Sequence, residues 1–171
     1  MTDSKPLVGV VMGSENDMDT MQKCLDQLEA FGIACEVKVV SAHRTPVDAH
    51  EYCTTARQRG LKIIIAGAGM SAALSGVMAA GTTLPVIGVP IASGPLNGID
   101  AALSTLQMPP GVPVAAVAIG SAGARNAGVL AAEILALADD ALAEKLETFK
   151  KDQADGVRKK NANVQEQLGN K

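Results

Sequence analysis

The amino-acid sequence predicts an α/β fold in which one open, mostly parallel, five-stranded sheet is covered by helices on both faces. Five short apolar runs begin at residues 7, 35, 62, 85 and 114, so that successive runs start 23–29 residues apart. This interval fits one strand followed by its crossover helix. The runs are apolar without strict alternation, as expected of parallel strands buried on both faces. Helical patterns lie between them, which completes the alternation typical of this class.

The element boundaries follow from local signals. The predicted strands cover 7–12, 35–40, 62–66, 85–89 and 114–119, and the predicted helices cover 17–31, 46–59, 72–80, 99–106 and 124–138. Gly32 and Gly60 are suited to end the first two helices. Thr45 is a good N-cap and Pro46 a good first helical residue. The charged tail over 141–168 is predicted to be helical in its first half.

Length and composition narrow the class of protein. The 171 residues fit one domain, with a core over about 7–138 and a C-terminal helical arm over about 139–168. A hydrophobic content of 47% is enough for a sizeable core. A net charge of −3 argues against a nucleic-acid surface and against binding to anionic membranes. With 2% aromatic residues, there is also little for unpaired bases to stack on.

The sequence also predicts a cytoplasmic protein. Its three cysteines form no dense disulfide framework, which fits a reducing compartment. The N-terminal residues lack the apolar segment of a signal peptide. No stretch of about 18 strongly apolar residues runs without Gly, Pro or polar interruption, so no membrane partner is expected.

Two loops after predicted strands carry polar side chains at helix starts, and ligands of open α/β sheets bind at this end of the strands. Gly13 to Asp17 runs straight into a helix, whose free N–H groups can bind an anion. Ser41 to Pro46 places His43 beside Arg44. Arg suits a phosphate through its planar fork of donors, and His suits proton transfer near neutral pH. The alternatives are a plain helix cap in the first loop and a packing His in the second.

The third loop, Gly67 to Ala72, formally matches the dinucleotide fingerprint G-x-G-x-x-A. We reject an NAD-type site, because the loop does not follow the first strand and no Asp or Glu occurs between Glu51 and Asp100. The small residues still predict a pocket wall, since Gly allows a ligand close to the backbone. The Gly/Pro-rich loop over 90–98 could act as a lid.

The remaining His and Cys residues predict no metal site. No zinc-type spacing occurs, and neither residue type appears after Cys53. His50 is expected to be a surface or subunit-contact residue. The residues alone therefore indicate a site for a phosphate-bearing small molecule, with one acid/base His, no metal and no cofactor.

Six motifs follow one another along the chain. They are M-G-S-x-x-D (12–17), S-A-H-R-T-P (41–46), I-I-A-G-A-G (64–69), L-P-V-I-G-V-P (84–90), Q-M-P-x-G-x-P-V (107–114) and G-x-A-G-A-x-N-A (120–127). In this order, from about Val8 to Ala138, the chain resembles the PurE family, the N5-carboxyaminoimidazole ribonucleotide mutases of de novo purine synthesis.

The resemblance implies a fold, an assembly and a reaction. The fold would be a flavodoxin-like three-layer αβα sandwich, and the assembly a homo-octamer with sites shared between subunits. The reaction would move a carboxylate from N5 to ring carbon C4 of an aminoimidazole ribonucleotide, without metal or organic cofactor. Decarboxylation would leave a trapped CO2 that C4 then attacks, with His43 as the proton shuttle.

The resemblance also implies which residues bind the substrate. These are Ser14, Asn16, Asp17, Ser41, Arg44, Ala68, Gly69, Ser71 and Leu74. Arg44 and the serines suit the phosphate. Asp17 suits the ribose hydroxyls, because a carboxylate accepts hydrogen bonds from hydroxyls and repels phosphate.

The chain departs from the family pattern in two loops. Met18 stands where the family has Trp, and the third loop reads A-G-A-G-M-S-A-A-L-S-G where the family reads A-G-A-G-G-A-A-H-L-P-G. Ala73 thus replaces a His, and the A-L-S-G piece is similar to a sister class that carboxylates aminoimidazole ribonucleotide directly with CO2. Arg44 is typical of the mutase. We therefore expect the mutase, with the direct carboxylase and a non-catalytic ribonucleotide-binding module as alternatives.

Overall fold

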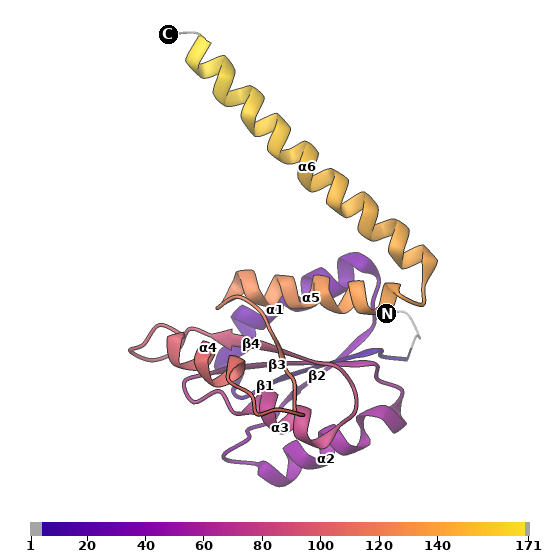
Figure 1. The fold of residues 1–171 in the computed structure, drawn as a ribbon, viewed down its shortest axis with the longest axis vertical. Helices are drawn as coiled ribbons and strands as arrows, with labels where there is room; N and C mark the ends of the chain where they lie inside the picture. Colours follow the sequence, from indigo (N-terminus) through magenta and orange to yellow (C-terminus); the bar gives the residue numbers. More distant parts are fainter. Residues whose placement is uncertain (1–4, 170–171) are drawn as a thin grey trace. The chain divides into compact units, whose positions relative to one another are not determined.

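Five parallel strands form one sheet in the order β2-β1-β3-β4-β5 (Figure 1). In this computed structural model, which describes residues 5–169, the strands are β1 (Val8–Met12), β2 (Cys35–Val39), β3 (Ile63–Gly69), β4 (Val86–Ile91) and β5 (Ala115–Ala116). The order reverses between β1 and β3, as in flavodoxin-like folds, and ligands of such folds bind beside this reversal. The predicted parallel five-stranded sheet is confirmed.

Helices cover both faces of the sheet. They are η1 (Glu15–Asp17), α1 (Met18–Phe31), α2 (Pro46–Arg59), α3 (Leu74–Gly81), α4 (Ile99–Leu106), α5 (Ser121–Ala136) and α6 (Asp140–Gly169). Figure 1 shows α1 and α5 on one side of the sheet, with α2 and α3 on the other. Thr105 of α4 and Ser75 of α3 both lie against Gly88 of β4, so α4 shares the α3 side. The predicted three-layer arrangement is confirmed.

The core is aliphatic and dense. Every residue of β1 is buried, and Ile63, Ile64 and Ile65 of β3 have no exposed surface. Close packing depends on Gly88, because a Cβ there would clash with the Thr105 methyl group and lie 2.9 Å from Val114 Cγ1. This lets α3 and α4 lie close to the sheet.

Several predicted boundaries hold and others shift. Gly32 (φ 75°) and Gly60 (φ 101°) end α1 and α2 in the left-handed conformation, as predicted. The last strand, predicted over 114–119, is only two residues long. The tail, predicted to be helical in its first half, is helical throughout α6.

The contacts divide the chain into two compact units with their boundary between Ala131 and Ala132. In the second unit Leu142 and Leu146 are buried, and Lys150 Nζ lies 3.1 Å from Glu133 Oε1. An ion pair between Asp155 and Arg158 supports the middle of α6. The expectation of a single domain stays a prediction. Within residues 5–169, no helix has the length and hydrophobicity to span a membrane.

Candidate functional site

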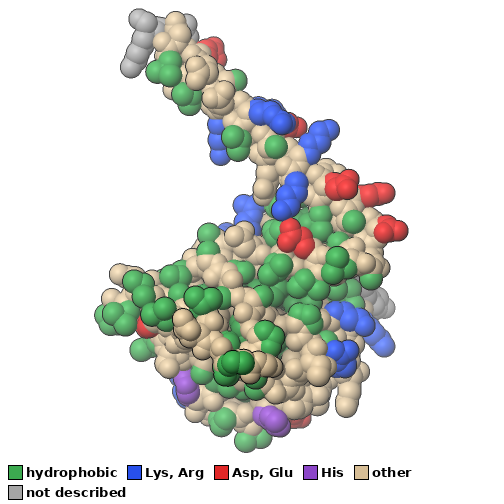
Figure 2. All heavy atoms as spheres, in the orientation of Figure 1, with side chains coloured by type: hydrophobic (Ala, Val, Ile, Leu, Met, Phe, Trp, Pro, Cys, Tyr) green, Lys and Arg blue, Asp and Glu red, His purple; other side chains and the backbone are tan. Residues whose placement is uncertain are grey.

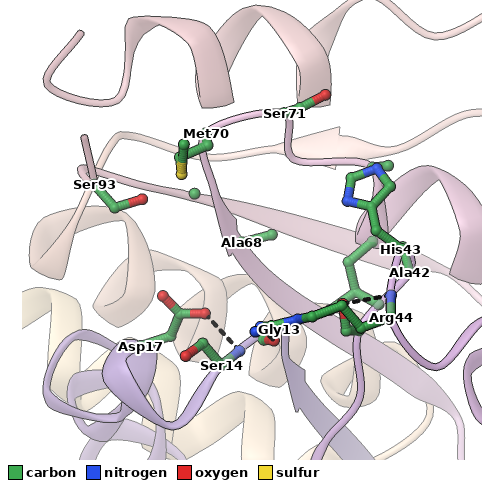
Figure 3. Close-up of a pocket in the computed structure, with 14 residues that line it drawn as sticks. Gly13, Ser14, Asp17, Ala42, His43, Arg44, Ala68, Met70, Ser71 and Ser93 are labelled. Carbon is green, nitrogen blue, oxygen red and sulfur yellow. Dashed lines mark hydrogen bonds between the residues drawn. The ribbon is translucent and has the colours of Figure 1, made fainter. Parts of the chain in front are cut away.

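A cavity of about 400 Å³ lies where β1, β2, β3 and β4 end (Figure 3). It is lined by Gly13, Ser14, Asp17, Ser41, Ala42, His43, Arg44, Ala68, Gly69, Met70, Ser71, Ala73, Leu74 and Ser93. Four loops far apart in the sequence therefore contribute to one site, at the end of the sheet where ligands of this fold class bind.

The loop after β1 is a capping box. The Ser14 N–H donates to Asp17 Oδ2 at 3.0 Å (Figure 3). Ser14 Oγ accepts from the Asn16 N–H at 3.3 Å. Asp17 is 7% exposed, and burial raises the pKa of its carboxyl, partly opposed by hydrogen bonds from the Ser14 and Gly13 backbone. The box therefore holds an acceptor against the cavity at the start of the helix.

The loop after β2 is held by its own side chains. Ser41 Oγ accepts from the Arg44 N–H at 3.1 Å, and Thr45 Oγ1 accepts from the Ser41 N–H at 2.9 Å. The Arg44 guanidinium donates through Nη2 to the Gly13 carbonyl oxygen at 3.3 Å, which ties this loop to the one after β1. His43 is exposed and lies on the opposite side of the cavity from Ser93 (Figure 3).

The loops after β3 and β4 form the far wall. A Cβ on Gly69 would overlap Ser93 Oγ, so the glycine is what lets Ser93 lie beside β3. Met70 follows with φ 54°, in the left-handed region that favours glycine. Leu74 then begins α3, with its side chain buried.

The chemistry of the lining is sparse. Only Asp17, His43 and Arg44 carry titratable side chains there; the others are glycines, serines and apolar residues. A second hollow of about 390 Å³ shares Ser14, Ser41 and Arg44, so the guanidinium borders both spaces. Across the described part of the chain, no three His, Cys, Asp or Glu side chains are grouped to hold a metal ion. The site offers one cation for an anion, one carboxyl group and one imidazole.

Nine of the ten residues predicted from the sequence line this cavity. The tenth, Asn16, is exposed and is not among the lining residues, so its role stays a prediction. The other five lining residues are not among the predicted site residues: Gly13, Ala42, Met70, Ala73 and Ser93. Met70 lies inside the loop over 67–72 that is predicted to be a pocket wall, and Ala73 follows that loop directly. Ser93 lies in the Gly/Pro-rich loop over 90–98. The missing signal for Ser93 was the strand order, which places β4 beside β3.

Comparison with known proteins identifies relatives over most of the chain. A model of the family described as AIR carboxylase matches residues 7–156. An N5-carboxyaminoimidazole ribonucleotide mutase of Bacillus subtilis is 58% identical over 143 residues, which cover 84% of this chain and 88% of that protein. A mutase of the same name from Aquifex aeolicus is 56% identical over 143 residues, 84% of each chain. The crystal structure of Treponema denticola PurE matches with a TM-score of 0.82 at 30% identity, covering 92% of this chain and 97% of that one.

Proposed function

This chain belongs to the AIR carboxylase family, and we propose that it is an N5-carboxyaminoimidazole ribonucleotide mutase of purine biosynthesis. It converts its substrate to 4-carboxy-5-aminoimidazole ribonucleotide. The observation that carries the proposal is the relatives of that name, which are more than half identical to this chain over 84% of its length. The cavity supports the proposal because it offers one guanidinium for a phosphate and one imidazole for proton transfer, between walls made mostly of small residues.

The ribose 5′-phosphate binds at the ends of β1 and β2. Arg44 supplies a fork of donors, and the hydroxyl groups of Ser14 and Ser41 lie in the same lining. The N-terminal end of η1 and α1 adds a favourable dipole for the phosphate. Asp17 accepts hydrogen bonds from the ribose hydroxyls, because its carboxylate would repel the phosphate. The small side of the cavity, with Ala68, then receives the imidazole ring.

The reaction moves one carboxyl group within the bound molecule. The bond between N5 and the carboxyl carbon breaks, CO2 leaves, and N5 takes up a proton. The electron pair of C4 then attacks the same CO2, and the proton on C4 leaves. His43 carries these protons, because it is the one imidazole in the lining. The chain needs no metal or cofactor for these steps.

The direct carboxylation of aminoimidazole ribonucleotide is the second candidate, and one observation favours it. Ala73 lines the cavity where the family pattern has a His. The sister class, to which the A-L-S-G piece is similar, starts from free CO2. Both reactions form the same bond at C4 and differ only in the source of CO2.

A paired assay without ATP tests the proposal. One arm supplies N5-carboxyaminoimidazole ribonucleotide in CO2-depleted buffer, and the other supplies aminoimidazole ribonucleotide with excess bicarbonate. We expect fast formation of the C4-carboxylated product in the first arm, and formation in the second only at high CO2. Efficient conversion in the second arm alone would identify a direct carboxylase. If neither arm forms product but the ribonucleotide binds tightly, the chain would be a binding module.

We also propose that the chain acts as a cytoplasmic homo-octamer whose subunits share sites, without nucleic-acid or membrane partners. Support for self-association comes from α4, where Ile99, Leu103 and Leu106 are 60%, 54% and 62% exposed. Their spacing of four and three residues places them on one face of the helix. Figure 2 shows hydrophobic side chains gathered over this part of the surface. An apolar helix face of this kind is typical of a subunit contact.

A further inference from the structure

Met70 has an unusual backbone for its residue type. Within residues 5–169, only Met70 (φ 54°) and Asn97 (φ 51°) have positive φ without being glycine. A residue with a Cβ is disfavoured in this region. Asn tolerates it better than Met, because its short polar side chain bonds locally. Met70 therefore carries a side chain at a backbone position that suits a residue without one.

The Met70 side chain lies at the edge of the cavity. It lines the cavity, yet it is 57% exposed. A Cβ on Gly94 would lie 3.6 Å from Met70 Cγ, so the side chain packs across the loop that follows β4. Figure 3 shows Met70 beside Ser93, with His43 on the other side of the cavity. The methionine thus spans the two loops that form the far wall.

The rest of the lining that this subunit contributes cannot supply an apolar cover. Its other apolar members are three alanines and Leu74, and Leu74 is only 2% exposed because it is built into α3. A thioether chain is unbranched, adapts its shape and makes favourable contacts with aromatic rings. An imidazole bound between the walls would meet Met70 as the one large apolar side chain of this lining that is not buried in a helix.

We propose that Met70 closes the solvent side of the cavity over the imidazole ring of the ligand and retains the CO2 released from N5. This inference rests on the proposed function. Retention matters because the carboxyl group is free between the two steps. If CO2 escapes, N5 keeps its new proton and the product is aminoimidazole ribonucleotide. If CO2 stays, C4 attacks it and loses its proton. Excluding water and holding the two reactants together favours the second course.

The experiment compares, in three variants, how the substrate divides between the C4-carboxylated product and released aminoimidazole ribonucleotide. N5-carboxyaminoimidazole ribonucleotide is supplied in CO2-depleted buffer, and both products are counted after subtraction of the enzyme-free decarboxylation. Met70→Gly removes the cover and should raise the fraction released as aminoimidazole ribonucleotide at least threefold. Met70→Leu keeps an apolar side chain and should hold that fraction near the wild-type value. Asn97→Gly is the matched control, since it changes the other left-handed residue outside the cavity lining.

Thermal melting separates this role from a structural one. Met70→Gly and Asn97→Gly should each melt at or above the wild-type temperature, because glycine suits the left-handed backbone. If Met70 had only a structural role, its replacement by Gly would leave the ratio of the two products unchanged. An unchanged partition in Met70→Gly would overturn the inference, and so would an equal shift in Asn97→Gly.

Failure of the proposed function is distinguishable. A wild-type protein that forms no C4 product from either substrate would overturn the proposed function and this inference together. If it works only from aminoimidazole ribonucleotide and bicarbonate, Met70→Gly should raise the half-saturating bicarbonate concentration at least threefold. An unchanged concentration would then overturn the inference alone.

Discussion

In the proposed reaction, His43 is the group that carries the protons, because it is the one imidazole in the cavity lining. We expect His43→Asn to lower kcat by about 10²–10⁴-fold, the usual contribution of a positioned acid/base. Binding of the ribonucleotide should change little, because Asn keeps a similar volume and the phosphate binds elsewhere. Turnover and calorimetric binding of aminoimidazole ribonucleotide measure the two effects.

The other histidine of the chain provides the control. His50 is exposed on α2 and does not line the cavity, as its expected surface position implies. His50→Asn should therefore leave turnover near the wild-type rate. Substantial activity in His43→Asn would remove His43 from proton transfer, and equal losses in both variants would point to a general effect on the fold.

Asp17 gives the stability of the protein a defined dependence on pH. Burial raises the pKa of its carboxyl above the ordinary value of 3.8, so the folded protein holds this proton more tightly than the unfolded chain. As pH rises from about 3.8 through the folded pKa, the unfolded state loses its proton first and the folded state becomes relatively less stable. In Asp17→Asn the side chain cannot titrate, so this variant does not lose stability in this way as pH rises.

Urea unfolding at several pH values between 4 and 7 tests this sign. The free energy of unfolding of the wild type, minus that of Asp17→Asn, should decrease as pH rises. A difference that stays constant or increases would show that the Ser14 and Gly13 hydrogen bonds outweigh burial at this carboxyl.

Gly88 sets how closely two helices pack on β4. We expect Gly88→Ala to lower the free energy of unfolding by about 1–3 kcal/mol, because the added methyl group would meet side chains of Thr105, Val114 and Ser75. Urea denaturation measures the change. Gly156→Ala is the matched control, because Gly156 lies inside α6 and a Cβ there would have nothing within 4 Å. This variant should raise the free energy of unfolding by about 0.5–1 kcal/mol. If Gly88→Ala leaves the free energy of unfolding unchanged, α3 and α4 can move apart to make room for the methyl group.

Elements with strong local signals could be predicted from the sequence. α2 begins at Pro46 and ends before Gly60, and both residues act through backbone geometry that needs no tertiary contact. The last strand is shorter than predicted, because within the apolar run over 114–119 only Ala115 and Ala116 pair in register with β4, although the Val117 N–H also donates to the Gly88 carbonyl. Pairing depends on a partner strand, which periodicity along one chain cannot describe.

Candidate site residues divide in the same way. Ser14, Arg44 and Gly69 could be predicted because each lies at or shortly after the end of a strand, in a segment with a chemical signature of its own. Ser93 carries no such signature. It joins the cavity through the order β3-β4 and through the missing side chain at Gly69, and both are properties of the folded sheet.

The exposed apolar face of α4 is the proposed subunit contact, so a charge placed on it should weaken self-association. We expect Leu103→Glu to reduce the molar mass in solution, because burying an unpaired carboxylate in a subunit contact is strongly unfavourable. Size-exclusion chromatography with light scattering measures it, and Leu103→Met, which keeps an apolar side chain, is the control. An unchanged mass in Leu103→Glu would place the subunit contact on another surface.

The hydrogen bond from Arg44 to the Gly13 carbonyl oxygen orients the guanidinium before the proposed phosphate arrives. Without a ligand, the guanidinium already has an acceptor 3.3 Å away. A guanidinium has five N–H donors and this bond uses one of them, so the others remain for a phosphate while the bond to Gly13 holds the side chain in place. A nucleoside that lacks the phosphate leaves Arg44 with its resident partner and gains nothing from it. Because Arg44 is exposed, its charge stays solvated when no phosphate is bound.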